Sequence, residues 1–233
     1  MSTKNKKKRQ TYSSTKAAAN KSSNKALIWL TLIFLAVIAI IVLGMNNQSK
    51  GYDFDYSGLP MQGSKDAPVK IVEFGDFKCP TCQYFAQNIE PQIKKDFIDT
   101  GKASMYFVNY PFLGPDSDWA AYAAQAVYHQ NPEAFWPYYK AIYDNQKDER
   151  TVWATPEVLV QLARDAKLDI DFDKLKTDIE KQTYKKEVDD QEAMVRPAGV
   201  EGTPAVFING KMYKGDLDYK DIQAAINKAV EGK

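Results

Sequence analysis

The chain has 233 residues, enough for one or two domains with a substantial core. Its formal net charge is only +1, but eight of its 31 Lys and Arg residues lie in residues 1–25, which contain no Asp or Glu. The remainder carries 23 basic against 30 acidic residues and is mildly acidic, so the basic face of a nucleic-acid-binding domain is not expected and no nucleic acid is predicted as a partner. Two Cys and one His exclude a disulfide-dense scaffold and an ordinary zinc finger.

Residues 26–45 form an uncharged apolar run of twenty residues, which as a helix would span about 30 Å and could cross a bilayer. Because the eight basic residues precede this run, the positive-inside rule places residues 1–25 in the cytoplasm and the rest of the chain outside. We therefore expect a single-pass signal anchor in the cell membrane. A cleaved signal peptide is the alternative, but its apolar core would be about 7–15 residues long and followed by small residues at a cleavage site.

Two polar segments flank the apolar run. Residues 1–25 show no apolar periodicity and are expected to be a disordered tail. Residues 46–68 contain three Gly and two Pro and are expected to be a linker that separates the membrane from a folded domain over residues 69–233. Since that domain is exported, it lies where disulfide bonds persist.

The folded domain opens with a predicted β-α-β unit. Residues 69–74 (VKIVEF) are β-branched and aromatic, lie between a proline and a glycine, and predict a buried strand. A helical stretch from Cys79 to about Thr100 follows, and then a second strand over residues 103–110. The two strands are expected to be parallel.

Residues 118–195 have helical periodicity and predict a helical insertion at about 116–195. Asn-Pro-Glu at 131–133 and Thr-Pro-Glu at 155–157 each offer a cap residue, a first-turn proline and an acid, and so predict helix starts. Pro137 predicts a kink or a late start in the first of these helices. One apolar helix face is formed by Trp119, Tyr122, Ala123, Ala126 and Val127.

The last part of the chain predicts a hairpin and a helix. Residues 205–208 and 211–214 are joined by Asn-Gly, the favoured type I′ turn, and residues 219–230 have helical periodicity. The element order is therefore βαβ, a helical insertion, then ββα, which makes the domain an α/β fold.

Cys79-Pro80-Thr81-Cys82 stands where a strand turns into a helix. A cysteine at a helix N-terminus faces free N–H groups and the positive end of the helix dipole, which favour its thiolate, the species that attacks disulfides. Cys82, one turn later, is expected to be less exposed and to attack a mixed disulfide on Cys79, releasing the partner.

Other interpretations of these residues remain open. A disulfide closing a four-residue loop would stabilise the fold by only about 2 kcal/mol, so a structural staple is one weak alternative. A zinc site would need further ligands, and His129, the one candidate, is expected to be an ordinary surface or packing residue. Asp169, Asp171 and Asp173 alternate like metal ligands but lack the glycine and glutamate of a calcium loop, and are expected to cap helices; no metal is predicted.

Glu73 and the sequence Gly202-Thr203-Pro204 are the other candidates. If the first strand alternates, Glu73 shares an apolar face with Val69 and Ile71, where burial would raise its pKa and let it exchange a proton with Cys82. The alternative is a solvated or salt-bridged Glu73. Pro204 at the start of a strand is unremarkable by itself, and a trans peptide bond is the base expectation.

In combination, Glu73-Phe74-Gly75-Asp76-Phe77-Lys78-Cys79-Pro80-Thr81-Cys82 and Gly202-Thr203-Pro204 resemble the DsbA-like branch of the thioredoxin-fold thiol:disulfide oxidoreductases, and within it the membrane-anchored BdbD-type proteins of Gram-positive bacteria. The resemblance covers about residues 58–230. It implies a thioredoxin fold with a helical insertion, preceded here by one transmembrane helix.

The resemblance also implies roles for individual residues. Cys79 would be the nucleophile, Cys82 the resolving thiol and Glu73 the buried acid. Thr203-Pro204 would be a cis-proline loop whose backbone pairs with an extended substrate. Pro80-Thr81 differs from the Gly-Pro of thioredoxin, as Lys78 does from its Trp, and these differences favour the oxidant branch.

The predicted function is a dithiol oxidase that donates its disulfide to unfolded exported proteins and is reoxidised by a DsbB-like membrane protein. It would use no cofactor beyond the redox-active disulfide, and a monomer is expected. A reductase or isomerase of the same fold is an alternative, because the reduction potentials of such proteins run from about −270 to −120 mV. A tethered holding module without catalysis is a third possibility.

Overall fold

The computed structural model describes residues 28–39 and 51–232, which belong to two separate units. In the first unit, residues 28–39 are helical and their side chains are exposed. Within the described residues, none of the helices is long and apolar enough to span a membrane. The predicted tail, the remaining residues of the predicted anchor and residues 46–50 lie outside the described part.

The second unit is built on a five-stranded sheet with the order β1-β3-β2-β4-β5. β2 and β3 are parallel, which confirms the predicted β-α-β unit, and the other neighbours are antiparallel. β4 and β5 form the predicted hairpin, in which Asn209 and Gly210 both have positive φ, as a type I′ turn requires. The strands are β1 (Met61–Gln62), β2 (Val69–Gly75), β3 (Ala103–Asn109), β4 (Ala205–Ile208) and β5 (Lys211–Met212).

The linker expected at residues 46–68 is wrong for residues 51–68, which are part of this unit. β1 pairs with β3, and the Tyr52 N–H donates a 2.7 Å hydrogen bond to the Gly210 carbonyl. Phe54 and Leu59 are buried against the sheet face that carries Val72. The glycines and prolines of the segment shape turns between these anchoring side chains, so they do not make it a free tether.

The single helix expected between Cys79 and Thr100 is divided into three pieces. They are α2 (Pro80–Asn88), α3 (Glu90–Ile93) and a π-helical turn (Lys94–Ile98). Pro91 explains the break at Ile89, because a proline cannot donate to the carbonyl four residues earlier and its ring clashes with it.

The insertion is helical, as predicted. A 3₁₀ turn (Pro132–Ala134), capped by the Asn131 side chain, precedes α5, so Pro137 falls in the first turn of a helix that starts late. Thr155 caps α6 and Asp171 caps α7. The helices are α4 (Pro115–Gln130), α5 (Phe135–Asp144), α6 (Pro156–Asp165), α7 (Phe172–Glu180), α8 (Lys185–Glu192) and α9 (Val195–Ala198).

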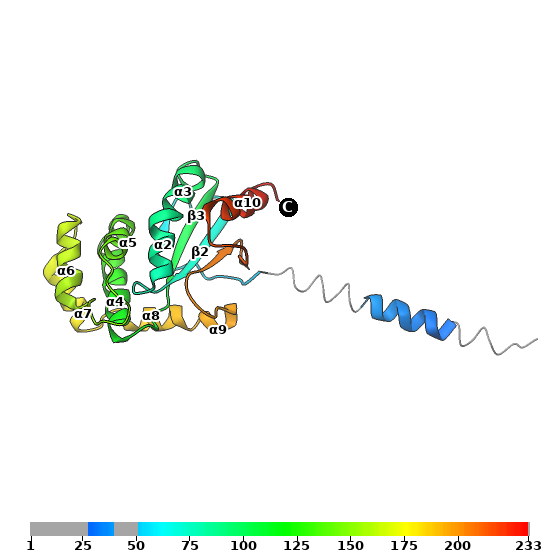
Figure 1. The fold of residues 1–233 in the computed structure, drawn as a ribbon, viewed down its shortest axis with the longest axis horizontal. Coiled ribbons are helices and arrows are strands. Elements are labelled where there is room, and N and C mark those ends of the chain that lie inside the picture. The colour runs from blue at the N-terminus through cyan, green and yellow to red at the C-terminus, as the bar shows by residue number, and fades with distance from the viewer. Residues whose placement is uncertain (1–27, 40–50, 233) are drawn as a thin grey trace, which may run out of the picture. The chain divides into compact units, whose positions relative to one another are not determined.

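Both faces of the sheet are covered. Val69 and Ile71 of β2 pack with residues of α2, α3 and α10 (Tyr219–Val230), whereas Val72 and Phe74 pack with the segment before β1 and with residues near α9. A third cluster joins both cysteines to α4, α5, α6 and α7. In Figure 1 these four helices lie beside α2 on the side away from α10. The insertion therefore packs against the segment where β2 is followed by α2.

Candidate active site

A hydrogen-bonded turn places Cys79 at the N-cap of α2. The Asp76 carboxylate accepts the Lys78 N–H at 2.8 Å, and the Asp76 carbonyl accepts the Cys79 N–H at 2.9 Å. Pro80 then occupies the first helical position, where its missing N–H costs nothing. Pro80 and Thr81 are exposed, so the turn presents the cysteine motif at the surface.

The two sulfurs, both free thiols, lie in different environments. Cys79 is 7% exposed, and Cys82 is fully buried. The hydrogen bond from the Cys82 thiol lowers the pKa of Cys79 to about 6; Thr203 and the N–H groups of Cys82 and Thr81 also lower it, while burial opposes them. Burial, and then the hydrogen bond with Cys79, raises the pKa of Cys82 well above its ordinary value. At neutral pH one thiol is therefore ionised and its neighbour is not.

The Thr203–Pro204 peptide bond is cis, the isomer that the resemblance implies. The pairing of β4 with β2 brings this loop to the cysteines, since Ala205 lies opposite Phe74. The Cys79 thiol donates to the Thr203 carbonyl at 3.4 Å. The buried Thr203 hydroxyl has no hydrogen-bond partner of good geometry, although it lies close enough to lower the pKa of both cysteines.

Glu73 lies in the middle of β2 with no exposed surface, on the same face as Val69 and Ile71. Tyr139 of α5 donates a 2.8 Å hydrogen bond to Oε2, while Oε1 has no partner. Burial raises the pKa of Glu73 well above its usual range, and the Tyr139 hydrogen bond opposes this only in part. Glu73 thus retains a proton at a pH where an exposed glutamate has lost it.

Three side chains, two from α5 and one from the loop that follows it, contact the active site, and none was expected from the sequence. Tyr139 holds Glu73, and the Tyr143 hydroxyl donates to the Asp76 carbonyl at 3.3 Å. The Gln146 amide donates to the carbonyls of Phe77 and Cys79 at 2.8 and 3.1 Å. Tyr139 and Tyr143, four residues apart, lie on one face of α5, a signal that could be recognised only once the packing of α5 against β2 is known.

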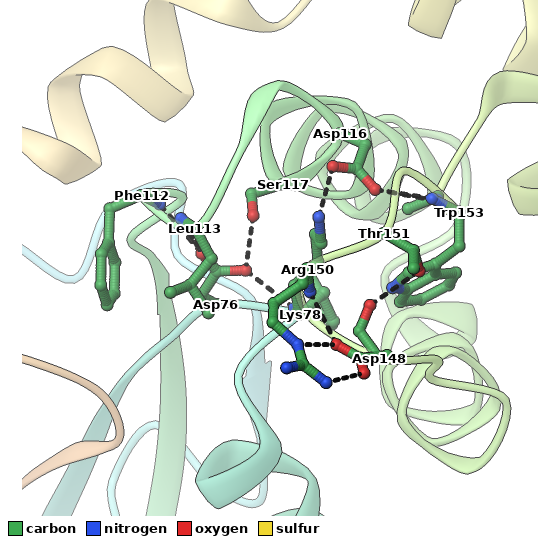
Figure 2. A network of polar contacts seen from close by, with 12 residues as sticks. Asp76, Lys78, Phe112, Leu113, Asp116, Ser117, Asp148, Arg150, Thr151 and Trp153 are labelled. Atoms are coloured by element: carbon green, nitrogen blue, oxygen red, sulfur yellow. Dashed lines mark hydrogen bonds and ion pairs between the residues drawn. The ribbon is translucent and has the colours of Figure 1, made fainter.

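A second polar cluster, also missed from the sequence, lies beside the turn (Figure 2). The Asp76 carboxylate accepts hydrogen bonds from Lys78 N–H, Ser117 Oγ–H and the N–H groups of Phe112 and Leu113. The Lys78 ammonium lies 2.6 Å from Asp116 Oδ1, and both side chains are buried. The cluster joins the turn before α2 to the start of α4 and to the loop between α5 and α6.

The remaining candidates contact other residues of the insertion. His129 Nε2 lies 2.7 Å from Glu187 Oε2, and the His129 ring stacks on the Tyr184 ring. Asp171 caps α7, accepting from the N–H groups of Asp173 and Lys174. In the part of the chain that the structure describes, no three His, Cys, Asp or Glu side chains are grouped to hold a metal ion.

Comparison with known proteins gives consistent matches over this whole unit. A family model described as Thioredoxin matches residues 57–228. The "Probable disulfide bond formation protein D" of Bacillus anthracis is 37% identical over 217 residues, covering 91% of this chain and 99% of the relative. Oxidised BdbD from Bacillus subtilis aligns with a TM-score of 0.74 at 35% identity, covering 78% of this chain and 98% of that one. DsbA from Chlamydia trachomatis aligns with a TM-score of 0.70 at 28% identity, covering 77% and 95%.

Proposed function

Because the chain belongs to the DsbA-like family of thioredoxin-fold thiol:disulfide oxidoreductases, we propose that it is a dithiol oxidase that donates a Cys79–Cys82 disulfide to exported proteins. It is an extracytoplasmic enzyme of disulfide formation, and its substrates are proteins. The observation that carries the oxidase assignment is the separation of the two thiol pKa values. A stabilised Cys79 thiolate favours the reduced form, so the oxidised form readily passes its disulfide on.

The reaction transfers two electrons from the substrate to the enzyme. A substrate thiolate attacks Cys79 Sγ, the Cys79–Cys82 bond breaks, and Cys82 leaves and takes up a proton. A second substrate thiolate then attacks the substrate sulfur of the mixed disulfide, which expels the Cys79 thiolate. In the reverse sense Cys82 attacks the mixed disulfide and releases the substrate, so Cys82 is the leaving group when substrate is oxidised and the resolving thiol when the mixed disulfide is released without oxidation.

Glu73 is assigned the proton transfer to and from Cys82. Its raised pKa lets it hold a proton at a pH where an exposed glutamate has lost it, and its electrostatic effect on Cys82 supports their proximity. Tyr139 orients the carboxyl through Oε2 and leaves Oε1 free.

The Thr203-Pro204 loop is assigned the binding of an extended substrate segment beside Cys79. The hydrogen bond between the Cys79 thiol and the Thr203 carbonyl supports this position. Substrate backbone groups would pair there as an added strand. Pro80 and Thr81 are exposed and would form the other border of the contact.

The anchor and the partner complete the proposal. Residues 26–45 hold the chain in the cell membrane as a single pass, with residues 1–25 in the cytoplasm; the exposed apolar side chains of the helical residues 28–39 support this assignment. A DsbB-like membrane protein removes the two electrons after each cycle and restores the disulfide. The protein acts as a monomer, with no cofactor besides its own disulfide.

Oxidation of a reduced, unfolded protein substrate tests the proposal. The oxidised full-length chain in detergent should remove two substrate thiols per enzyme, and Cys79→Ser should remove none. Its reduction potential against glutathione should lie well above the value of about −270 mV typical of thioredoxin. A potential near that value, with slow substrate oxidation, would assign the protein to the reductases instead.

Protease treatment of wall-stripped cells tests the topology. The folded unit should be digested while residues 1–25 stay protected. Digestion of an N-terminal tag in intact cells would contradict the proposed orientation.

A further inference from the structure

We propose that Lys78, through its buried ion pair with Asp116, is a positioning residue that sets how strongly the Cys79 sulfur holds a negative charge. The inference rests on the proposed function of Cys79 and adds to it the group that tunes this sulfur. It concerns the cluster drawn in Figure 2, formed by Asp76, Lys78, Asp116 and Ser117 together with the backbone N–H groups of Phe112, Leu113, Trp153 and Ala154.

The Lys78 side chain is in an unusual place for a lysine. It is 2% exposed and points inward from the residue directly before Cys79, although lysines are almost never fully buried unless they are paired. Its ammonium lies 2.6 Å from Asp116 Oδ1, and Asp116 has no exposed surface. An ion pair buried this completely is little screened by salt, so its charges affect the ionisation of neighbouring groups.

Asp116 is held so that the pair has one geometry. Its Oδ2 accepts the N–H groups of Trp153 at 2.9 Å and Ala154 at 3.2 Å. Burial alone would raise the pKa of Asp116, but the hydrogen bonds from Lys78 and these two amides bring it below its ordinary value. A Cβ atom at Gly114 would lie 3.3 Å from both Asp116 Oδ1 and Lys78 Nζ, so the pair is also closely packed.

The shape of the turn does not depend on the Lys78 side chain. The hydrogen bond that forms the turn uses the Lys78 backbone N–H, which donates to Asp76 Oδ1 at 2.8 Å. Any residue other than proline supplies that N–H. The buried ammonium must therefore contribute something other than the turn, and its charge is what distinguishes it from an apolar side chain of equal length.

The net charge of the cluster indicates what the Lys78 ammonium contributes. The carboxylates of Asp76 and Asp116 and the ammonium of Lys78 give the cluster one net negative charge. The neighbouring Asp148 and Arg150 pair with each other at the surface and add no net charge. Without Lys78, the cluster would carry two buried negative charges at the turn that leads into Cys79, the residue directly after Lys78, with Cα atoms about 3.8 Å apart. Like charges disfavour the thiolate, so the lysine protects the low pKa of Cys79.

Three variants separate charge from packing. Lys78→Met keeps the length of the side chain and the backbone N–H but leaves the cluster at two negative charges. In the double variant Lys78→Met with Asp116→Asn, the net charge returns to one, and the amide oxygen of Asn can still accept from Trp153 and Ala154. Lys78→Arg keeps the charge with a different shape. All are made in the full-length chain, and circular dichroism establishes that each is folded.

The readout is the pH dependence of Cys79 alkylation by iodoacetamide in the reduced protein. Lys78→Met should raise the pKa of Cys79 by about one unit, which is a tenfold loss of thiolate below that pKa. Its reduction potential should fall by about 30 mV for each tenfold loss. The double variant and Lys78→Arg should both return toward the wild-type pKa, even where their melting temperatures are lower.

Two results would overturn the proposal. One is a folded Lys78→Met protein whose Cys79 titrates as in the wild type. The other is an equal shift in Lys78→Met and in the double variant, which would show that the side chain acts only by packing. Neither depends on whether the protein works as an oxidase, because thiol titration is measured without substrate, so failure of the proposed function would be seen separately in the substrate oxidation assay.

Discussion

Glu73 and Asp116 are both buried carboxyl groups near the start of α2, yet their pKa values shift in opposite directions. Glu73 lies among apolar side chains with one hydrogen bond from Tyr139, and burial dominates. Asp116 receives an ammonium and two backbone N–H groups, which together outweigh burial. The difference shows that hydrogen-bond donors, and not depth, decide which buried acid carries a proton and which carries a charge.

The comparison assigns each region a different task. The Glu73 region is suited to moving a proton, because an unpartnered carboxyl oxygen can exchange one. The cluster of Asp76, Lys78 and Asp116 is suited to holding fixed charges and a fixed turn, because its oxygens are occupied by donors. Substitutions of the two carboxyl groups Glu73 and Asp76 should therefore separate proton transfer from stability.

The largest effect is expected from Asp76→Ala. It leaves the Ser117 hydroxyl and three backbone N–H groups without their buried acceptor, each at a cost of about 1–3 kcal/mol before relaxation. We expect a loss of about 3–5 kcal/mol in the free energy of unfolding, measured by denaturant titration. Asp190→Ala, which removes an exposed aspartate paired with Lys186, is the matched control and should change stability by less than about 0.5 kcal/mol.

Glu73→Gln should change the rate of the reaction more than the stability of the fold. Gln can still accept the Tyr139 hydrogen bond but cannot exchange a proton with Cys82, so release of a mixed disulfide by attack of Cys82 should slow by about 10–100-fold. Rapid-mixing measurements with a labelled substrate give this rate. An unchanged rate would remove Glu73 from the reaction.

The pH dependence of stability adds a second test of Glu73. Its pKa is raised in the folded state, so its contribution to stability is complete below the unfolded value and is lost as pH rises through the folded value. Wild type should therefore lose stability relative to Glu73→Gln as the pH rises above about 4.5, the ordinary pKa of a glutamate. A constant difference across this range would contradict the raised pKa.

A smaller effect is expected from Cys79 itself. Its pKa is lowered from 9.0 to about 6 in the folded state, so the stability it contributes is complete above the unfolded value and lost as pH falls through the folded one. At pH 7 about 1 kcal/mol should remain. Melting temperatures of the reduced protein should rise between pH 5 and pH 9 relative to the oxidised protein, which lacks this ionisation. Parallel curves for the two forms would contradict the assignment.

Local signals explain what could be predicted from the sequence. Asn209-Gly210 and Thr155-Pro156 specify a turn and a helix start by themselves, and both lie where they were expected. The apolar face of β2 followed from strict alternation, which put Glu73 among Val69 and Ile71. Glu73 could therefore be singled out before its hydrogen-bond partner was known.

Long-range contacts explain what was missed. Lys78 and Asp116 are 38 residues apart, and a lysine whose partner is not known is normally expected at the surface. The segment 51–68 was misread because its glycines and prolines outweighed Phe54 and Leu59, whose burial depends on a sheet face formed later in the chain. In both cases the deciding information is the position of a distant segment.

The contacts that α5 and Gln146 make with the active site have a consequence for engineering. Tyr139 and Tyr143 of α5 and Gln146 of the loop after it, all in the insertion, form hydrogen bonds with Glu73, Asp76, Phe77 and Cys79. A miniaturised enzyme that kept only the sheet, α2, α3 and α10 would retain both cysteines. It would still lose the Tyr139 hydrogen bond to Glu73 and the hydrogen bonds from Tyr143 and Gln146 to the turn before α2. The insertion is therefore a required part of the catalyst.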